Sequence, residues 1–93
     1  MPRYYVYFDQ AKGQARTSTK KPNTFPFIYV GEGFFTFVPS KGVQARCRSI
    51  EELEYFLFAH ELQAVDEQRQ KAFRALRERL EAMKTLREVR QHG

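Results

Sequence analysis

The sequence contains few of the residues from which catalytic and metal centres are usually built. It has one cysteine, Cys47, two histidines, His60 and His92, and two aspartates, Asp9 and Asp66. A single cysteine cannot form an internal disulfide or supply the ligand pairs of a zinc knuckle. No paired carboxylates, Ser/His/Asp set or glycine-rich phosphate loop stands at the spacing that catalysis or cofactor binding requires. We therefore expect a protein that is not an enzyme and that has no cofactor and no metal.

Long apolar runs are scarce as well. The uncharged and mostly apolar stretch of residues 55–59, like the others in the chain, is far shorter than the roughly 18–20 residues of a membrane span. Residues 1–3 and the aromatic run after them lack the small-residue cleavage site of a signal peptide. The lone cysteine fits a reducing compartment. These features favour a cytoplasmic protein with no membrane partner.

Glycine and proline are confined to the first half of the chain. All four prolines and every glycine except Gly93 precede residue 43, and ten of the fourteen aromatic residues lie in residues 4–37. Residues 43–92 are instead rich in Glu, Arg, Leu, Ala and Gln, which favour helices. Strands followed by helices define an α+β fold. We expect one domain over residues 1–93, with its sheet in residues 3–48.

The alternation of apolar and polar residues predicts a mainly antiparallel sheet of four or five strands. The expected strands are residues 3–9, 14–20, 25–30, 34–38 and 43–48. Residues 31–33 should form a hairpin loop with a left-handed residue, and residues 39–42 a turn. In the last strand Val43, Ala45 and Cys47 alternate inward, so Cys47 should be buried and inert.

A packing helix is expected over residues 49–62. Ser49 and Glu52 form a capping box, in which the Ser49 side chain accepts from the backbone N–H of Glu52. The helix should then lie on the sheet through an apolar stripe of the type that core-facing helices carry. The members of this stripe are Ile50, Leu53, Phe56, Leu57, Phe58 and Leu62.

A long charged amphipathic helix is expected over residues 65–91. Phe73, Leu76, Leu80 and Met83 are spaced by 3, 4 and 3 residues, which is typical of a coiled-coil seam. Opposite charges recur four residues apart, as in Arg74 with Glu78 and Arg77 with Glu81. Neither Gly nor Pro marks a turn between residues 62 and 68. The seam can therefore close within the monomer as an antiparallel helix pair, or belong to an unbroken helix that pairs with a second subunit.

Charge is divided in the same way as composition. Residues 1–48 carry eight basic and two acidic residues, a net +6, whereas residues 49–93 carry eight basic and nine acidic residues, a net −1. Cations on a sheet can neutralise phosphates, and tyrosines beside them can stack on bases. The candidate nucleic-acid-binding residues are Arg16, Lys20, Lys21, Lys41, Arg46, Arg48, Tyr5, Tyr7 and Tyr29.

Two functions remain open at this point. The first is a small basic, non-enzymatic binding module that contacts nucleic acid through a cationic aromatic sheet. The second is a protein-binding inhibitor or adaptor of the type that phages and mobile elements encode, for example an anti-CRISPR-like inhibitor of a nucleic-acid-handling complex. This second function is suggested by the hairpin of residues 25–38, which is apolar on both faces. In that case Phe73, Leu76, Leu80 and Met83 would form a protein interface, which would also serve a homodimer.

Overall fold

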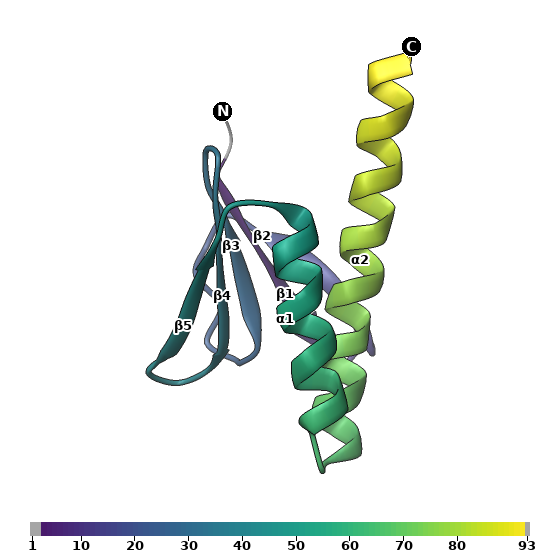
Figure 1. Cartoon of the computed structure of the whole chain (residues 1–93). Helices are drawn as coiled ribbons and strands as arrows, with labels where there is room; N and C mark the ends of the chain where they lie inside the picture. The colour runs from purple at the N-terminus through teal and green to yellow at the C-terminus, as the bar shows by residue number, and fades with distance from the viewer. Residues whose placement is uncertain (1–2, 93) are drawn as a thin grey trace.

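The computed structural model describes residues 3–92, with side chains as far as Lys84, and it has two layers (Figure 1). A five-stranded sheet forms one layer and two helices form the other, which confirms the α+β prediction. The elements are β1 (Tyr4–Asp9), β2 (Gln14–Ser18), β3 (Phe27–Val30), β4 (Phe35–Ser40), β5 (Val43–Cys47), α1 (Ile50–Gln63) and α2 (Glu67–His92).

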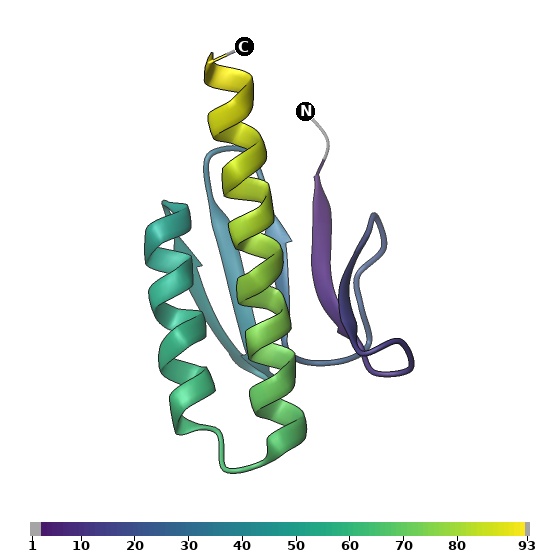
Figure 2. The same ribbon diagram turned by 90° about the vertical axis from the view of Figure 1, so that its right-hand side faces the viewer.

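The strands lie in the order β2-β1-β3-β4-β5, and every neighbouring pair is antiparallel. Val6, Ile28 and Phe37 stand opposite one another on β1, β3 and β4. Both helices cover the face to which these three side chains point, α1 over β4 and β5 and α2 over β1 and β2 (Figure 2). Side chains alternate along a strand, so the neighbours of these residues lie on a second face, here named the open face.

The hydrophobic core fills the space between the sheet and the two helices. Phe37 and Leu76 are fully buried there, and Phe37 meets the ring of Phe73 at a centroid distance of 6.1 Å. Ring pairs of this kind add about 0.5–1.5 kcal/mol beyond the area that they bury. The core cluster consists of Val6, Ile28, Phe37, Cys47, Ile50, Leu53, Leu57, Phe73, Leu76 and Leu80.

Both helices begin at a side-chain cap. Ser49 Oγ accepts from the backbone N–H of Glu52 at 3.1 Å, as predicted for α1. The helix ends at Gln63, and Asp66 then caps α2, because its carboxylate accepts from the backbone N–H of Gln68 at 2.9 Å. The short polar side chain of Asp66 thus starts a second helix in a segment where neither Gly nor Pro is present. The chain turns back here, and the two helices pack as an antiparallel pair within the monomer (Figure 2).

The predicted seam of α2 lies inside this pair. Phe73, Leu76 and Leu80 are at most 3% exposed, and Met83 is half-buried. A side chain enclosed in the core cannot contact another protein. The prediction that Phe73, Leu76 and Leu80 form a protein or homodimer interface is therefore wrong for the folded chain.

The inward stripe of α1 also differs from the expected one. Phe58 is 47% and Leu62 is 68% exposed, whereas Glu61 is buried in their place. Arg74 Nε lies 2.9 Å from Glu61 Oε1, and an Arg77 terminal nitrogen lies 2.9 Å from Oε2. A buried carboxylate is stable when several charge-assisted hydrogen bonds satisfy it. These two arginines, for which we predicted partners on their own helix, join α2 to α1.

Several details of the sheet differ from the prediction, among them the end of β2, which lies at Ser18 and not at residue 20. Pro39 lies within β4 and not in the following turn, at an irregularity in the pairing with β5 between Phe37 and Ser40. Proline cannot donate to a ladder, so it is tolerated at such a point. The same irregularity leaves Val43 50% exposed, although we expected it to point inward. In addition β3 begins at Phe27, two residues later than expected.

Replacing Glu61 tests the link between the helices. Glu61→Ala should lower the free energy of unfolding by about 1–3 kcal/mol, because two arginines lose a shared charged acceptor and water only partly replaces it. Urea denaturation measures the change. Glu78→Ala is the matched control, since exposed Glu78 stands four residues after Arg74 and should cost less than about 0.5 kcal/mol. Equal losses in the two variants would contradict the assignment.

Candidate functional site

The open face of the sheet carries the tyrosines that the sequence singled out. Tyr5 and Tyr7 alternate with the buried Val6 and Phe8, and Tyr29 stands opposite Tyr5 on the neighbouring strand. The three tyrosine side chains are partly exposed. Neither described helix lies on this side of the sheet (Figure 1). The tyrosines are therefore available to a ligand, with their rings anchored in the sheet.

Phenylalanines extend two of these tyrosines, Tyr5 and Tyr29, into a continuous line of five rings, here named the ring row. It runs through Phe34, Tyr29, Tyr5, Phe27 and Phe25. Successive centroids are 5.8, 5.1, 5.9 and 5.6 Å apart, which is the usual range for interacting aromatic pairs. Phe27 itself is buried, while Phe25 is 39% exposed. The row crosses the middle of the sheet from the β3–β4 hairpin to the loop before β3.

Gly31 leaves the space in which the ring at one end of the row lies. A Cβ at this position would stand 2.7 Å from two ring carbons of Phe34 and 3.1 Å from a ring carbon of Tyr29. Any other residue would thus displace Phe34. The same hairpin contains Gly33 with a φ of +75°, a conformation in which glycine has no steric penalty and which confirms the predicted left-handed residue.

Two arginines lie on the open face at opposite edges of the sheet. The Arg46 guanidinium on β5 stacks over the Phe34 ring, 4.1 Å from its centroid, in a cation–π contact. On β2 at the other edge, Arg16 stands opposite Tyr7 and lies 3.4 Å from the Asp9 carboxylate. The charge of Arg16 is thus partly balanced by Asp9. Both side chains flank the ring row.

The remaining predicted cations lie at the ends of the strands. Lys20 follows β2 and Arg48 follows β5, and the strand pairing brings these two strand ends to the same end of the sheet. Lys21 and Lys41 lie near the other end of the ring row, one in the β2–β3 loop and the other in the β4–β5 turn. All four are exposed. The cations therefore surround the rings without covering them.

Lys21 and Lys41 line one hollow of about 670 Å³, here named the basic hollow. The β2–β3 loop, the start of β3, the strand β4, the β4–β5 turn and the start of β5 each contribute to it. Phe25 and Phe27, the last two members of the ring row, form part of its wall. The full lining is Lys21, Asn23, Phe25, Phe27, Val38, Lys41, Gly42, Val43 and Gln44, and it includes no acidic residue.

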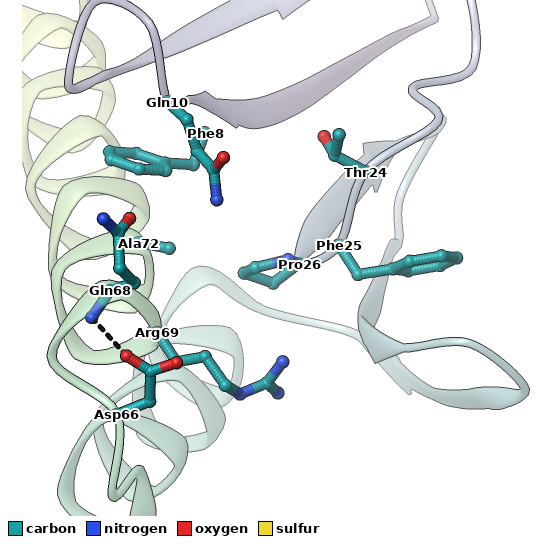
Figure 3. Close-up of a pocket in the computed structure, with 9 residues that line it drawn as sticks. All are labelled: Phe8, Gln10, Thr24, Phe25, Pro26, Asp66, Gln68, Arg69 and Ala72. Carbon is teal, nitrogen blue, oxygen red and sulfur yellow. Dashed lines mark hydrogen bonds between the residues drawn. The ribbon is translucent and has the colours of Figure 1, made fainter.

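A second and smaller cavity, of about 250 Å³, lies between the start of α2 and the sheet (Figure 3). Its charged side chains are Asp66 and Arg69. The Asp66 carboxylate already accepts from Gln68, and an Arg69 terminal nitrogen lies 3.4 Å from the carbonyl oxygen of Pro39. The carboxylate repels anions, and both charged groups already hold elements of the fold in place. This cavity is less suited to phosphates than the basic hollow.

The side chains of Cys47 and His60 both pack in or against the hydrophobic core. Cys47 is fully buried, as predicted, and burial raises the pKa of its thiol, with a further increase from Glu52. His60 packs against the rings of Phe37 and Phe73, and burial lowers its pKa, as does Arg69 to a smaller extent. Among the residues that the structure describes, no three His, Cys, Asp or Glu side chains are grouped so that they could hold a metal ion.

Sequence reasoning missed two components of this site. It assigned the phenylalanines of residues 25–38 to the apolar hairpin that suggested protein binding, although the alternation already placed Phe25 and Phe27 on the same face as Tyr29. The contribution of Gly31 had no local signal, because it depends on where the Phe34 ring lies in space. The ring row therefore joins three phenylalanines to two of the three predicted tyrosines, while Tyr7 lies on the same face outside the row.

Comparison of the chain with models of protein families, with curated proteins and with solved structures finds no match. Within the described part of the chain, neither helix combines the length and the apolar character that a membrane crossing requires.

The burial of His60 predicts a specific dependence of stability on pH. The pKa of His60 is lower in the folded chain than its ordinary value of 6.5, so the unfolded chain binds the proton more tightly. The free energy of unfolding should consequently fall as pH decreases from about 6.5 through the folded pKa.

Urea denaturation of the wild type and of His60→Leu at about pH 7.5 and about pH 5 measures this effect. The decrease in stability between the two pH values should be smaller in His60→Leu, which has no imidazole to protonate. His92→Gln is the control and should retain the decrease of the wild type. Identical decreases in the wild type and His60→Leu would contradict the assignment.

Proposed function

We propose that this protein is a non-enzymatic binding module for single-stranded nucleic acid and that the open face is its binding surface. The observation that carries the proposal is the ring row with Arg46 and Arg16 at its two sides. Positively charged side chains attract the phosphate backbone, and aromatic rings stack on bases regardless of sequence. The surplus charge of residues 1–48, a net +6, belongs to the layer that carries these rings.

The shape of the surface favours a single strand over a duplex. Bases in a duplex are stacked on one another, so the rings of a protein can reach their faces only in unpaired segments. The open face presents rings set into a sheet, and neither described helix lies on that side to enter a groove (Figure 1). Arg46 adds a planar cation that already stacks on Phe34 and keeps N–H groups available for a phosphate.

Binding should therefore be strong at low salt and should weaken steeply as salt is added. For single strands the logarithm of the affinity falls by about 0.7 per phosphate contact for each tenfold increase in salt. Arg46→Gln should weaken binding several-fold and reduce this slope by about 0.7. Tyr29→Leu should weaken binding by about fivefold or more, since one stacking contact contributes about 1–3 kcal/mol.

Fluorescence anisotropy with a labelled single strand of mixed sequence, and with the same sequence as a duplex, provides the measurement. Arg79→Gln is the control for charge, because exposed Arg79 belongs to α2 in the helix layer. Its affinity should remain within about twofold of the wild type. The proposal is wrong if the wild type does not bind the single strand at low salt, or if Arg79→Gln weakens binding as much as Arg46→Gln.

A second candidate function, protein binding, is favoured by the outer side of α1. Tyr55 is 71%, Phe58 47% and Leu62 68% exposed, and Val65 just beyond the helix is fully exposed. Tyr55, Phe58 and Leu62 are spaced by 3 and 4, so they form one apolar stripe on the side of α1 away from the core, and Val65 follows the end of this helix. Exposed apolar patches of this kind often mark contacts between proteins. A homodimer would use this stripe rather than the buried seam of α2.

Light scattering at high salt tests the stripe as a homodimer contact. The wild type should then have a mass near twice 11.0 kDa that falls to the monomer value at low concentration. Leu62→Glu should be monomeric throughout, because it places a charge in the stripe, while Glu78→Ala should behave like the wild type. A monomer at every concentration would contradict a homodimer.

A further inference from the structure

We infer that the basic hollow is a binding site for one nucleotide unit, with the base against Phe25 and the phosphate between Lys21 and Lys41. This inference deepens the proposed function, on which it rests, by assigning a specific site to one part of the strand. The hollow is the place on the open face where the ring row meets two lysines. Its volume of about 670 Å³ lies within the usual range of ligand pockets, roughly 300–1,000 Å³.

The charge of the hollow suits a phosphate. Lys21 and Lys41 come from segments that are twenty residues apart in sequence, and both line the same hollow. Its lining contains no Asp or Glu, and no ion pair of either lysine is among those that the structure describes. Both ammonium groups can therefore contact an incoming anion without first breaking a salt bridge.

The remainder of the lining suits a base. Phe25 and Val43 are 39% and 50% exposed, so they offer apolar surface to the faces of a planar ring. Asn23 and Gln44 add side-chain amides, which can donate to and accept from the polar edge of a base. A nucleotide combines these two features, an apolar face with a polar edge and an anionic group beside it.

The ring row connects this hollow to the rest of the open face. Tyr5 contacts Phe27 and Phe27 contacts Phe25, at centroid distances of 5.9 and 5.6 Å. A strand whose bases stack on Tyr29 and Tyr5, beside the Arg46–Phe34 pair, would therefore continue into the hollow. The same site would accept a nucleotide within a strand or a free nucleotide, since both have the same base and phosphate chemistry.

The test compares two double variants that remove the same charge. Lys21→Gln with Lys41→Gln should weaken binding of a labelled single strand at low salt by about tenfold or more and reduce the salt slope by about 1.4. Lys12→Gln with Lys71→Gln is the control. Lys12 lies in the β1–β2 turn and Lys71 lies close to Gly13 of that turn, and neither lysine lines the hollow. Affinity in the control should stay within about twofold of the wild type.

Base contact is tested with Phe25→Leu and with a strand of equal length that contains abasic sites. The wild type should bind the normal strand more tightly than the abasic one, and Phe25→Leu should reduce this difference. Unfolding measurements should show that these exposed substitutions leave the fold intact. The inference is overturned if the Lys21 and Lys41 double variant, or Phe25→Leu, behaves like the wild type while Arg46→Gln still weakens binding; the proposed function would then survive.

Free adenosine monophosphate and inorganic phosphate distinguish the two sources of the ligand. Adenosine monophosphate at millimolar concentration should shift the backbone amide resonances of Asn23 and Gly42 in the wild type and not in the double variant. Inorganic phosphate should cause smaller shifts, because it has no base. If the wild type binds no single strand, the proposed function fails, and shifts with the free nucleotide would then still support the hollow. The absence of shifts in that case would overturn the inference as well.

Discussion

The whole molecule depends on the fact that two helices cover only one face of a five-stranded sheet. The core forms on that face, from Val6, Ile28 and Phe37 below and from α1 and α2 above. The second face has to be stable in water, so its rings are tyrosines or are shielded by one another, and arginines lie at its edges. Burial on one side and exposure on the other therefore follow from the same alternation along each strand. That constraint places the aromatic and cationic residues together.

The pairing of α1 with α2 holds this arrangement in place. Glu61 lies almost without solvent contact between Arg74 and Arg77, and Lys84 lies 3.4 Å from the Glu54 carboxylate near the start of α1. Apolar packing supplies most of the energy of such a helix pair, whereas charged hydrogen bonds at fixed positions select its register. The buried carboxylate of Glu61 also explains why the inward-facing residues of α1 differ from the stripe expected from the sequence, since Glu61 occupies a position between the helices.

Much of the fold could be predicted from the sequence because it depends on local patterns. The split in glycine and proline, the alternation of Tyr5 and Tyr7 with Val6 and Phe8, and the Ser49 cap are all features of neighbouring residues. What could not be predicted depends on contacts between distant residues. α1 has apolar residues on two sides, and only the arginines of α2, thirteen and sixteen residues beyond Glu61, decide which side faces inward. The break between the helices had a local signal, because Asp66 is a good N-cap residue. Whether the chain breaks there or continues as one helix depends, however, on how the second helix packs.

The candidate site shows the same division. Membership of the open face follows from alternation, so Arg16, Arg46 and the tyrosines could be assigned to strand faces before the strand order was known. Whether the two arginines lie on one face depends on the order β2-β1-β3-β4-β5, which puts them on opposite edges with the rings between them. The basic hollow depends further on a loop and a turn that meet only in the folded chain. Lys21 and Lys41 look like scattered surface charge in the sequence, and only the folded chain brings them into the lining of one hollow with Phe25 and Phe27.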